Sequence, residues 1–500
     1  MTQLRVPGYE VWGLLGEGGM SEVWLAKHVV LAAPVVVKTL RRGLRTTDTQ
    51  GATARILQEA RLMARVSSPR IVRALDAGQL EPSEDSTDGA RTPFLVQEYV
   101  DGLDFAELDR RRRASLGVGL PLWLVCRVMR DVCKGLRAAH QAGVIHRDLK
   151  PSNVFSEPHT GIRLGDFGIA VAASDGVPPE NAGTLPFMPP ELLRSGDVGR
   201  FTDVWGAAAT ACDLRYGYKP FASVDEIVDS TKAPRFPAPV SPAEAYFQDV
   251  LRRMLSKDVA TRPHDVLAPL SHFEMLTKAL EPPEPPVSRV GPATLLFGGL
   301  KLSFVVGDIA RAPADAIVSS ANFELRMRSG VGEALRLRGG DELEEEAMAG
   351  GEQPLGSCIR TKPGKLDTKH VFHAVSAWNE VSCVGRAFAR ALILAEEHGC
   401  TSIAAPALGT GAARVGIEMC ANAMMTTLRW HAMLGGSRVR EVTIWLDSDA
   451  KRRVYQDVAE EVLGLQEARY FGPADVGLPD DDARISADGA TCLDPNTPVR

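Results

Sequence analysis

The 500-residue sequence has few of the features that mark secreted or membrane proteins. It contains only 8 cysteines, and none of them forms a CxxC pair or follows the spacing of a zinc site. Free thiols in a reducing compartment are therefore expected. No apolar run approaches the roughly 18–20 residues that span a membrane, and the N-terminal MTQLRVPGYE lacks the apolar core of a signal peptide. These absences predict a cytoplasmic protein that makes no contact with a membrane.

The sequence also lacks an excess of positive charge. Its 57 lysines and arginines against 63 aspartates and glutamates give a formal net charge of -6 at pH 7. Proteins that bind nucleic acid through charge are generally basic, so no nucleic-acid partner is expected. Hydrophobic residues make up 45% and charged residues 24%, which is usual for folded domains and excludes a wholly disordered chain.

Length and two changes in composition divide the chain. Because domains usually hold about 100–200 residues, more than one is expected. Residues 281–292, EPPEPPVSRVGP, include five prolines, which predicts an extended linker over 281–293 with neither helix nor strand. Residues 466–500 are rich in Asp, Gly and Pro and poor in large apolar residues, which predicts a disordered tail. Two folded domains remain, 1–280 and 294–465.

The two predicted domains differ in pattern. The first opens with short apolar runs typical of antiparallel strands (YEVWGLLGEG, SEVWLAKHV, APVVVKTL) and then turns helical (ARILQEARLMARV, PLWLVCRVMRDVCKGLRAAH). A strand-rich lobe and a helical lobe with a cleft between them are expected, an α+β arrangement. The second alternates strands with helices, among them one continuous helix predicted over 331–349. Such alternation predicts an α/β sheet with helices on both faces.

A glycine-rich turn joins the first two predicted strands. Gly16, Gly18 and Gly19 would let backbone N–H groups approach phosphate oxygens without a Cβ in the way. By itself this pattern fits an ordinary hairpin equally well. Lys38 ends the buried run VVV, where an unpaired charge is costly, so it requires an anionic partner. Glu59 on the following helix is one candidate.

Two further motifs follow at fixed spacing, His146 to Asn153 (HRDLKPSN) and Asp166-Phe167-Gly168. Together with LGEGGMSEVW, VVVK and MPPE, they make the sequence from about Tyr9 to Leu280 resemble the protein kinase family, in its eukaryotic-like bacterial Ser/Thr form. The resemblance implies a bilobal kinase fold, ATP and Mg²⁺ as cofactors, and proteins with Ser or Thr hydroxyls as substrates.

The resemblance also implies a role for each matching residue. Asp148 would accept the substrate proton and Lys150 would neutralise the γ-phosphoryl group, while Mg²⁺ would be held by Asn153 and Asp166. The ATP-binding residues would be Gly16, Gly18, Val23, Lys38, Glu59, Gln97 (the gatekeeper) and Val100, and the activation loop would carry Ser174 and Thr184. Structural roles would fall to Asp203, bracing the catalytic loop, and to a pair formed by Glu191 and Arg262.

In the second domain, polar or glycine-rich loops follow several predicted strands. They are GDI at 307–309, SSAN at 319–322, SGVG at 329–332 and PALGTG at 406–411. Glycine-rich loops that lead into helix N-termini suit a diphosphate, although each alone could be a connecting turn. In this order they resemble the macrodomain family from about Leu295 to Leu465. That resemblance implies ADP-ribose as ligand, bound by Asp308, Ile309, Asn322, Gly330, Val331, Gly409, Thr410 and Gly411.

The same resemblance bears on whether this domain hydrolyses its ligand. One large class of hydrolytic macrodomains has an Asp directly after the Gly-Val of the first loop, where this sequence has Gly332 followed by Glu333. We therefore favour a domain that binds ADP-ribose or ADP-ribosylated protein and regulates or targets the kinase. The alternatives are an ADP-ribosyl hydrolase or O-acyl-ADP-ribose deacylase regulated by its kinase domain, and a pseudokinase scaffold.

Overall fold

A computed structural model describes residues 4–17, 21–40, 57, 60–61, 63–80, 92–157, 161–167, 185–194, 198–378, 381–411 and 415–465. The predicted tail, residues 466–500, lies outside these residues. Within the described residues, no helix is long and apolar enough to cross a membrane.

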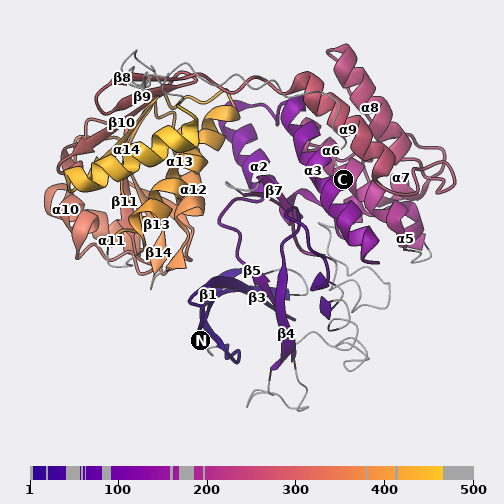
Figure 1. The fold of residues 1–500 in the computed structure, drawn as a ribbon, viewed down its shortest axis with the longest axis horizontal. Coiled ribbons are helices and arrows are strands. Elements are labelled where there is room, and N and C mark those ends of the chain that lie inside the picture. The colour runs from indigo at the N-terminus through magenta and orange to yellow at the C-terminus, as the bar shows by residue number, and fades with distance from the viewer. Residues whose placement is uncertain are drawn as a thin grey trace, which may run out of the picture. The chain divides into compact units, whose positions relative to one another are not determined.

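The N-terminal lobe is a five-stranded antiparallel sheet in the order β1-β2-β3-β5-β4 (Figure 1). Its strands are β1 (Tyr9–Glu17), β2 (Ser21–His28), β3 (Pro34–Leu40), β4 (Ala74–Leu80) and β5 (Thr92–Glu98). The first three coincide with the apolar runs in the sequence. Val35 and Val37 of β3 are buried on one face of the sheet. Because side chains alternate along a strand, Lys38 lies on the opposite face.

The second lobe is helical, as the 3–4 spacing of apolar residues predicts. Its α3 helix is buried along one face from Leu124 to Ala139 and packs against α9 and α6. The elements of this lobe are α2 (Phe105–Leu116), α3 (Leu122–Gln141), η1 (Pro151–Asn153), β6 (Val154–Glu157), β7 (Gly161–Leu164), η2 (Leu185–Phe187), α5 (Pro190–Arg194), α6 (Arg200–Tyr216), α7 (Val224–Val228), α8 (Pro242–Met254) and α9 (Leu267–Leu280).

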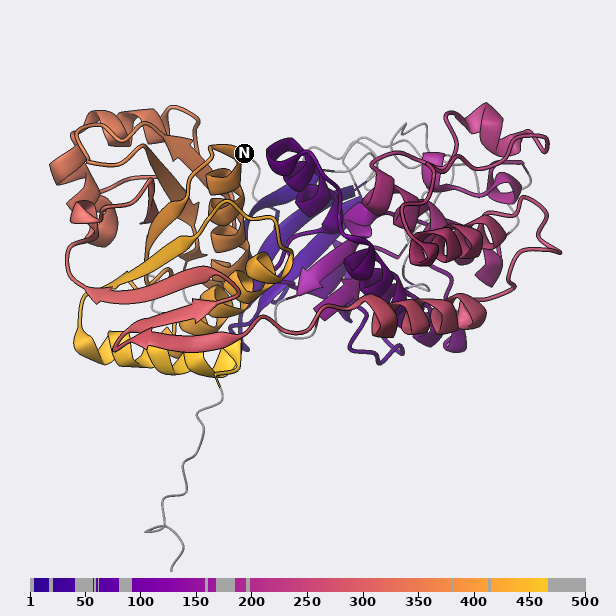
Figure 2. The same cartoon turned by 90° about the horizontal axis from the view of Figure 1, so that it is seen from above.

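The C-terminal region is an eight-stranded mixed sheet in the order β12-β13-β11-β16-β17-β10-β9-β8. Strands β13, β11, β16, β17 and β10 run parallel, and Figure 2 shows the sheet between α14 on one side and α10 and α11 on the other. The strands are β8 (Val287–Gly291), β9 (Thr294–Phe297), β10 (Leu300–Val306), β11 (Ala316–Ala321), β12 (Cys358–Thr361), β13 (His370–Val375), β16 (Ser402–Pro406) and β17 (Glu441–Leu446). The other elements are η3 (Ile309–Arg311), α10 (Gly330–Gly339), α11 (Glu342–Met348), β14 (Ala377–Trp378), β15 (Val381–Ser382), α12 (Val384–Glu397), α13 (Ile417–Met433) and α14 (Asp449–Leu463).

The α+β lobes and the α/β sheet confirm the predicted fold classes, but two local predictions are wrong. Strand β8 forms inside the segment 281–293, where neither helix nor strand was expected. Four of its five prolines precede Val287, and β8 is an edge strand that needs bonds on one side only. The single helix predicted over 331–349 is two helices, because Gly340 adopts a φ of 100° that ends α10. The limits 1–280 and 294–465 otherwise stay a prediction.

Candidate functional site

The HRDLKPSN motif folds into a loop that gathers three polar side chains. Lys150 Nζ lies 3.1 and 2.9 Å from the two carboxylate oxygens of Asp148. Asn153 Nδ2 donates to the backbone carbonyl of Asp148 at 2.6 Å and lies 3.2 Å from its Oδ2. The 3₁₀ turn η1, with Pro151 at its start, places Asn153 back against Asp148. The loop therefore presents a fixed carboxylate beside an ammonium group.

Buried contacts from other elements hold this loop in position. Asp203 of α6 accepts the backbone N–H groups of His146 and Arg147 at 2.8 and 2.9 Å, as the sequence predicted. The His146 side chain is fully buried and its Nε2 lies 2.9 Å from the Gly165 carbonyl. Its ring also lies 4.5 Å from that of Phe167. This histidine links the catalytic loop to the DFG motif, a role that the sequence reasoning did not assign.

Two residues of the motifs have left-handed backbone conformations. Arg147 has a φ of 66° and Asp166 a φ of 56°. Such conformations cost a non-glycine residue on the order of 1 kcal/mol or more and persist where the surrounding contacts require them. Two of the four non-glycine residues with positive φ in the described parts of the chain therefore lie in these two motifs, and such conformations often accompany a functional site.

Lys38 and Asp166 form an ion pair across the cleft, between strand β3 and the DFG motif. Burial lowers the pKa of Lys38 from 10.5 to about 7, while the negative charge of Asp148 opposes that shift. The negative charge of Asp166 in the ion pair likewise favours the protonated form of Lys38. A lysine held in this way gains from any further anionic group in the cleft, such as a phosphate.

The sheet above the cleft brings several predicted ATP-binding residues together. Val23 pairs with Gly16 on β1 and with Lys38 on β3. Gln97 pairs with Val36 and is 3% exposed, and Val100 is also buried. The predicted residues Gly18, Glu59, Ser174 and Thr184 lie outside the described residues, so nothing can be said of their positions.

The polar groups of the cleft fit a magnesium ion. Asp166 offers a carboxylate and Asn153 an amide oxygen, both hard ligands of the kind that Mg²⁺ prefers. No group of three or more His, Cys, Asp or Glu side chains that could hold a metal occurs within the described ranges. That also suits Mg²⁺, which usually takes only one or two protein carboxylates and completes its shell with water and phosphate oxygens.

A small pocket adjoins the Asp148 carboxylate on the side of the helical lobe. Its lining comes from the catalytic loop, from the segment after the activation loop and from α6: Arg147, Asp148, Leu149, Phe187, Met188, Pro189, Thr202, Asp203 and Gly206. Glu191, two residues after Pro189, forms the predicted pair with Arg262, which is therefore confirmed.

In the C-terminal region, the predicted ADP-ribose loops follow β10, β11 and β16. Because these strands are parallel in one sheet, the loops at their carboxyl ends lie at the same edge. Asp308 follows β10, Asn322 follows β11, and Gly409 to Gly411 follow β16. Gly330 and Val331 form the first turn of α10. The topology thus gathers residues that are far apart in the sequence.

The backbone of these loops fits a diphosphate. Gly409 has a φ of 81°, and a Cβ there would lie 2.9 Å from Val384 Cγ2 and 3.1 Å from Cys420 Sγ. Only glycine is therefore accommodated at this position without strain. Thr410 Oγ1 donates to the Ala407 carbonyl at 2.9 Å, which tightens the loop. The first N–H groups of α10 supply further donors that no helical carbonyl takes up.

Asp308 stands at the start of η3 and combines exposure with a basic neighbourhood. Its side chain is 42% exposed, and Oδ1 accepts the Ala310 N–H at 3.0 Å. Oδ2 lies 3.6 Å from Arg311 Nε and 3.5 Å from Arg338 Nε. The carboxylate is thus fixed but open to a donor such as an exocyclic amino group.

The two regions also contact each other directly, which nothing in the sequence indicated. The described residues of both, up to Gly464, belong to one compact unit. The segment 99–104 between β5 and α2 joins the two kinase lobes and is called the hinge here. In it, Asp101 follows Val100 and accepts the N–H groups of Gly385 and Arg386 at the start of α12, both at 2.9 Å. Glu107 of α2 forms a two-bond ion pair with Arg390, with both N–O distances 2.8 Å.

A hydrophobic cluster extends this contact. From the N-terminal lobe it includes Leu25 with Trp12, Leu15 and Tyr99, and from the C-terminal region it includes Leu325, Leu355, Val375 and Cys383 with Ala321 and Phe323. Ala321 and Phe323 flank Asn322, so the loop that carries this predicted ADP-ribose-binding residue packs on the sheet that covers the nucleotide cleft.

Comparison with known proteins identifies the domains that carry the two sites. The family model for the protein kinase domain matches residues 9–272, more than half of the chain. The chain therefore belongs to the protein kinase family. The family model for the macro domain matches residues 318–424, so the C-terminal region contains a macro domain.

Several curated relatives are bacterial kinases. Serine/threonine-protein kinase pkn3 of Myxococcus xanthus is 29% identical over 382 residues, covering 71% of this chain and 65% of that protein. Serine/threonine-protein kinase PknB of Mycobacterium leprae is 32% identical over 217 residues, covering 43% of this chain and 33% of that protein. The chain thus spans less than two thirds of the length of either relative. Among solved structures, the kinase domain of PknI from Mycobacterium tuberculosis matches with a TM-score of 0.43 and 26% identity, over 56% of this chain and 98% of that one.

Proposed function

We propose that this protein is a serine/threonine protein kinase whose macro domain binds ADP-ribose, free or attached to protein, and thereby regulates or targets the kinase. The observation that carries the kinase proposal is the cleft in which Asp148, Lys150 and Asn153 lie together opposite the Lys38–Asp166 pair. Each group that phosphoryl transfer requires is present in that cleft.

The geometry supports a distinct task for each residue. Bound ATP and Mg²⁺ supply the phosphoryl group and the positive charge that offsets its developing negative charge. Lys38 holds the α- and β-phosphates, and Asn153 and Asp166 hold the metal. Asp148 orients the substrate hydroxyl and accepts its proton. Lys150, 2.9 Å from Asp148, neutralises the transferred group as it approaches.

The direct test is phosphoryl transfer by the full chain. Purified protein is incubated with γ-labelled ATP, Mg²⁺ and myelin basic protein, with a parallel reaction containing EDTA. Label on serine or threonine that disappears on chelation of the metal supports the proposal. Absence of label, with ATP binding measured by calorimetry, would favour the pseudokinase scaffold instead.

For the macro domain we expect Asp308→Ala to weaken ADP-ribose binding at least tenfold, because a fixed carboxylate that accepts a hydrogen bond from the adenine amino group is lost. Calorimetric titration of the full chain with ADP-ribose measures the effect, and ADP is a matched ligand that lacks the distal ribose. Glu441→Gln, at the start of β17 and so at the opposite edge of the sheet, is the control because Glu441 is an exposed partner of Lys301. Equal affinity in Asp308→Ala and the unmodified protein would contradict this assignment.

The regulatory part rests on a short path between the two nucleotide sites. The diphosphate loop packs through Gly409 on Val384, the first residue of α12. The N–H groups of the next two residues, Gly385 and Arg386, bind Asp101, which adjoins Val100 in the hinge. A ligand that displaces the Gly409 loop therefore acts on the start of α12 and, through Asp101, on the hinge.

Gly385→Ala tests this path. A Cβ at Gly385 would lie 3.0 Å from Asp101 Oδ2 and 3.1 Å from Asp101 O, so Asp101 has to move. In the unmodified protein we expect saturating ADP-ribose to change the Kd for ATP by roughly fivefold or more, the usual size of such coupling. In Gly385→Ala the ratio should approach one. Gly416→Ala, where a Cβ meets nothing within 4 Å, is the matched control. Coupling that survives in Gly385→Ala would rule out this route.

A further inference from the structure

A second cavity lies between the kinase helix α2 and the macro-domain helices α12 and α13. Its empty volume is about 800 Å³, part of it open to solvent. It includes none of the residues assigned to ATP or ADP-ribose. Its lining is Asp101, Gly102, Leu103, Leu108, Arg112, Ser115, Leu116, Ser156, Gly385, Ala389, Leu392, Ile393, Glu396, Thr427, Trp430, His431, Leu434, Gly435 and Ser437.

The wall of this cavity is largely apolar and comes from both regions. Kinase residues Leu108 and Leu116 face α12 residues Leu392 and Ile393, with Trp430 of α13 beside them. Most of the hydroxyl groups in the lining already donate to backbone carbonyls: Ser115 to Arg111 and Arg112, Ser156 to Leu103, Thr427 to Ala423. The wall therefore suits the hydrocarbon part of a ligand, and cavities between domains are common ligand sites.

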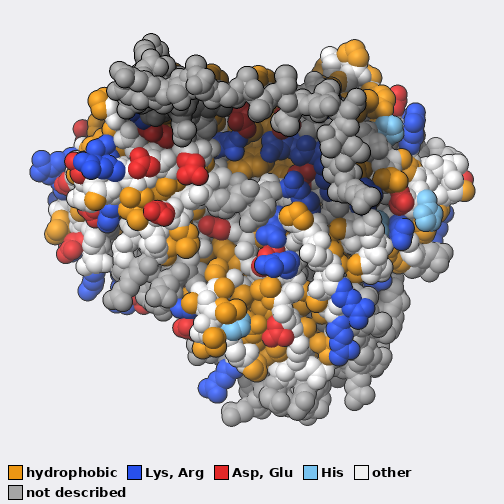
Figure 3. All heavy atoms as spheres, in the orientation of Figure 1, with side chains coloured by type: hydrophobic (Ala, Val, Ile, Leu, Met, Phe, Trp, Pro, Cys, Tyr) orange, Lys and Arg blue, Asp and Glu red, His pale blue; other side chains and the backbone are white. Residues whose placement is uncertain are grey.

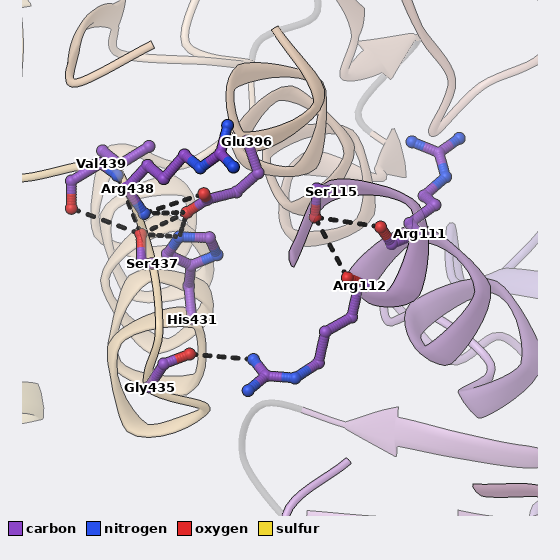
Figure 4. A network of polar contacts seen from close by, with 9 residues as sticks. All are labelled: Arg111, Arg112, Ser115, Glu396, His431, Gly435, Ser437, Arg438 and Val439. Carbon is purple, nitrogen blue, oxygen red and sulfur yellow. Dashed lines mark hydrogen bonds and ion pairs between the residues drawn. The ribbon is translucent and has the colours of Figure 1, made fainter. Parts of the chain in front are cut away.

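One acidic side chain at the far end of the cavity, that of Glu396, is hydrogen-bonded by other residues of the macro domain. Glu396 Oε1 lies 3.1 Å from His431 Nε2, and its oxygens accept the Arg438 N–H at 3.1 and 2.9 Å and the Ser437 hydroxyl (Figure 4). Burial would raise the pKa of Glu396, but these hydrogen bonds lower it to about 2. Its carboxylate thus has hydrogen-bond partners other than Arg112.

Arg112 donates hydrogen bonds to backbone carbonyls only, while the more distant carboxylates of Glu396 and Asp109 act on its charge and oppose the lowering of its pKa by burial. Its Nη1 donates to the Gly435 carbonyl at 2.9 Å, across the boundary between the two regions, and its Nε to the Gly119 carbonyl at 3.3 Å (Figure 4). The neighbouring Arg111 and Arg113 have carboxylate partners on α2, Glu107 and Asp109. Within the part of the chain that the structure describes, no carboxylate is within ion-pair distance of Arg112. Figure 3 shows other basic side chains gathered on this face where α2 and α3 lie.

A half-buried guanidinium with no ion pair, at the edge of an apolar cavity, has the chemistry to hold an anion that carries a hydrocarbon body. Arginine is always charged, so its remaining N–H donors keep their attraction for a carboxylate. We propose that this cavity is a regulatory site for a medium-chain fatty acid, whose carboxylate binds Arg112 and whose alkyl chain lies along Leu392, Ile393 and Trp430.

A ligand in this cavity contacts both regions at once. It therefore binds the docked arrangement more tightly than any separated one and stabilises it by mass action. Asp101, which holds the start of α12, lies in the cavity wall. The fatty acid thus strengthens the contact between hinge and macro domain rather than competing with either nucleotide.

The test titrates the full chain with decanoate by calorimetry, with decylamine and decanol as probes of equal length and different charge. Neither ATP nor ADP-ribose is added, so the outcome does not depend on the function proposed above. Decanoate should bind at one site and quench Trp430, a signal that Trp430→Phe removes. Arg112→Gln should weaken decanoate binding at least tenfold, whereas Arg110→Gln, on the exposed side of the same helix, should leave it unchanged.

A second variant guards against loss of folding in the first. Ala389→Phe fills the cavity without changing its charge and should also abolish binding, with the thermal transition monitored by circular dichroism. The proposal fails if decanoate does not bind, if decylamine binds as tightly, or if decanoate binds Arg112→Gln and Ala389→Phe as well as the unmodified protein.

Discussion

Asp148→Asn is expected to lower kcat for phosphoryl transfer by roughly 10²–10⁴-fold, the usual contribution of a positioned general base. An amide has the size of the carboxylate and still accepts a hydrogen bond from Lys150, but it takes no proton from the substrate. The affinity for ATP should change little, because Asp148 lies in the catalytic loop and not in the sheet that covers the nucleotide. Initial rates with labelled ATP, together with calorimetric ATP titration, separate the two quantities.

Asp225→Asn, an exposed position in the first turn of α7, is the matched control and should retain full activity. If Asp148→Asn phosphorylates as fast as the unmodified protein, the activity does not arise in this cleft. A loss of ATP binding in the variant would instead show that Asp148 is needed to shape the cleft.

Arg262→Met is expected to cost about 3–5 kcal/mol of stability, the usual penalty for removing one partner of a buried ion pair. The Arg262 side chain is 0% exposed and forms two bonds to Glu191, at 2.6 and 3.0 Å. It also donates to the Ser256 and Phe201 carbonyls and stacks over Trp205. Its loss removes these two bonds from the Glu191 carboxylate. Melting of the kinase lobe, followed by near-UV circular dichroism, measures the effect.

The double variant Glu191→Met with Arg262→Met separates the charge from the packing. It should be more stable than Arg262→Met alone, because the carboxylate that loses its guanidinium partner is also absent, and it measures how far the two residues act together. A double variant that loses as much as the sum of both single variants would show that the pair contributes no coupling energy.

The kinase cleft was largely predictable because its chemistry resides in short, ordered motifs. HRDLKPSN and DFG fix the identity and spacing of the polar groups, and the buried run Val35 to Val37 fixes where Lys38 lies. The role of His146 was missed, since a buried histidine has no sequence signal that distinguishes it from other core positions. The roles of Gly18, Glu59, Ser174 and Thr184 stay predictions.

The contact between the regions could not be predicted, for a physical reason. Asp101 and Glu107 bind Gly385 and Arg390, nearly three hundred positions away, through ordinary charges that any exposed helix could carry. Only the folded surfaces bring them together. The break at Gly340, by contrast, was visible in the adjacent glycines Gly339 and Gly340, and the helical periodicity on either side concealed it.

The hydrophobic cluster around Leu25 and Phe323 determines which surfaces each half of the chain would expose if it were produced alone. A kinase fragment ending at Leu280 would expose the apolar flank of its own nucleotide-binding sheet to water. It would also remove the macro-domain partners of Asp101 and Glu107. The macro domain in this sense covers part of the kinase surface, and both regions belong to one compact unit. A different macro domain in this position would have to supply the same apolar and polar contacts before it could transmit a signal to the kinase.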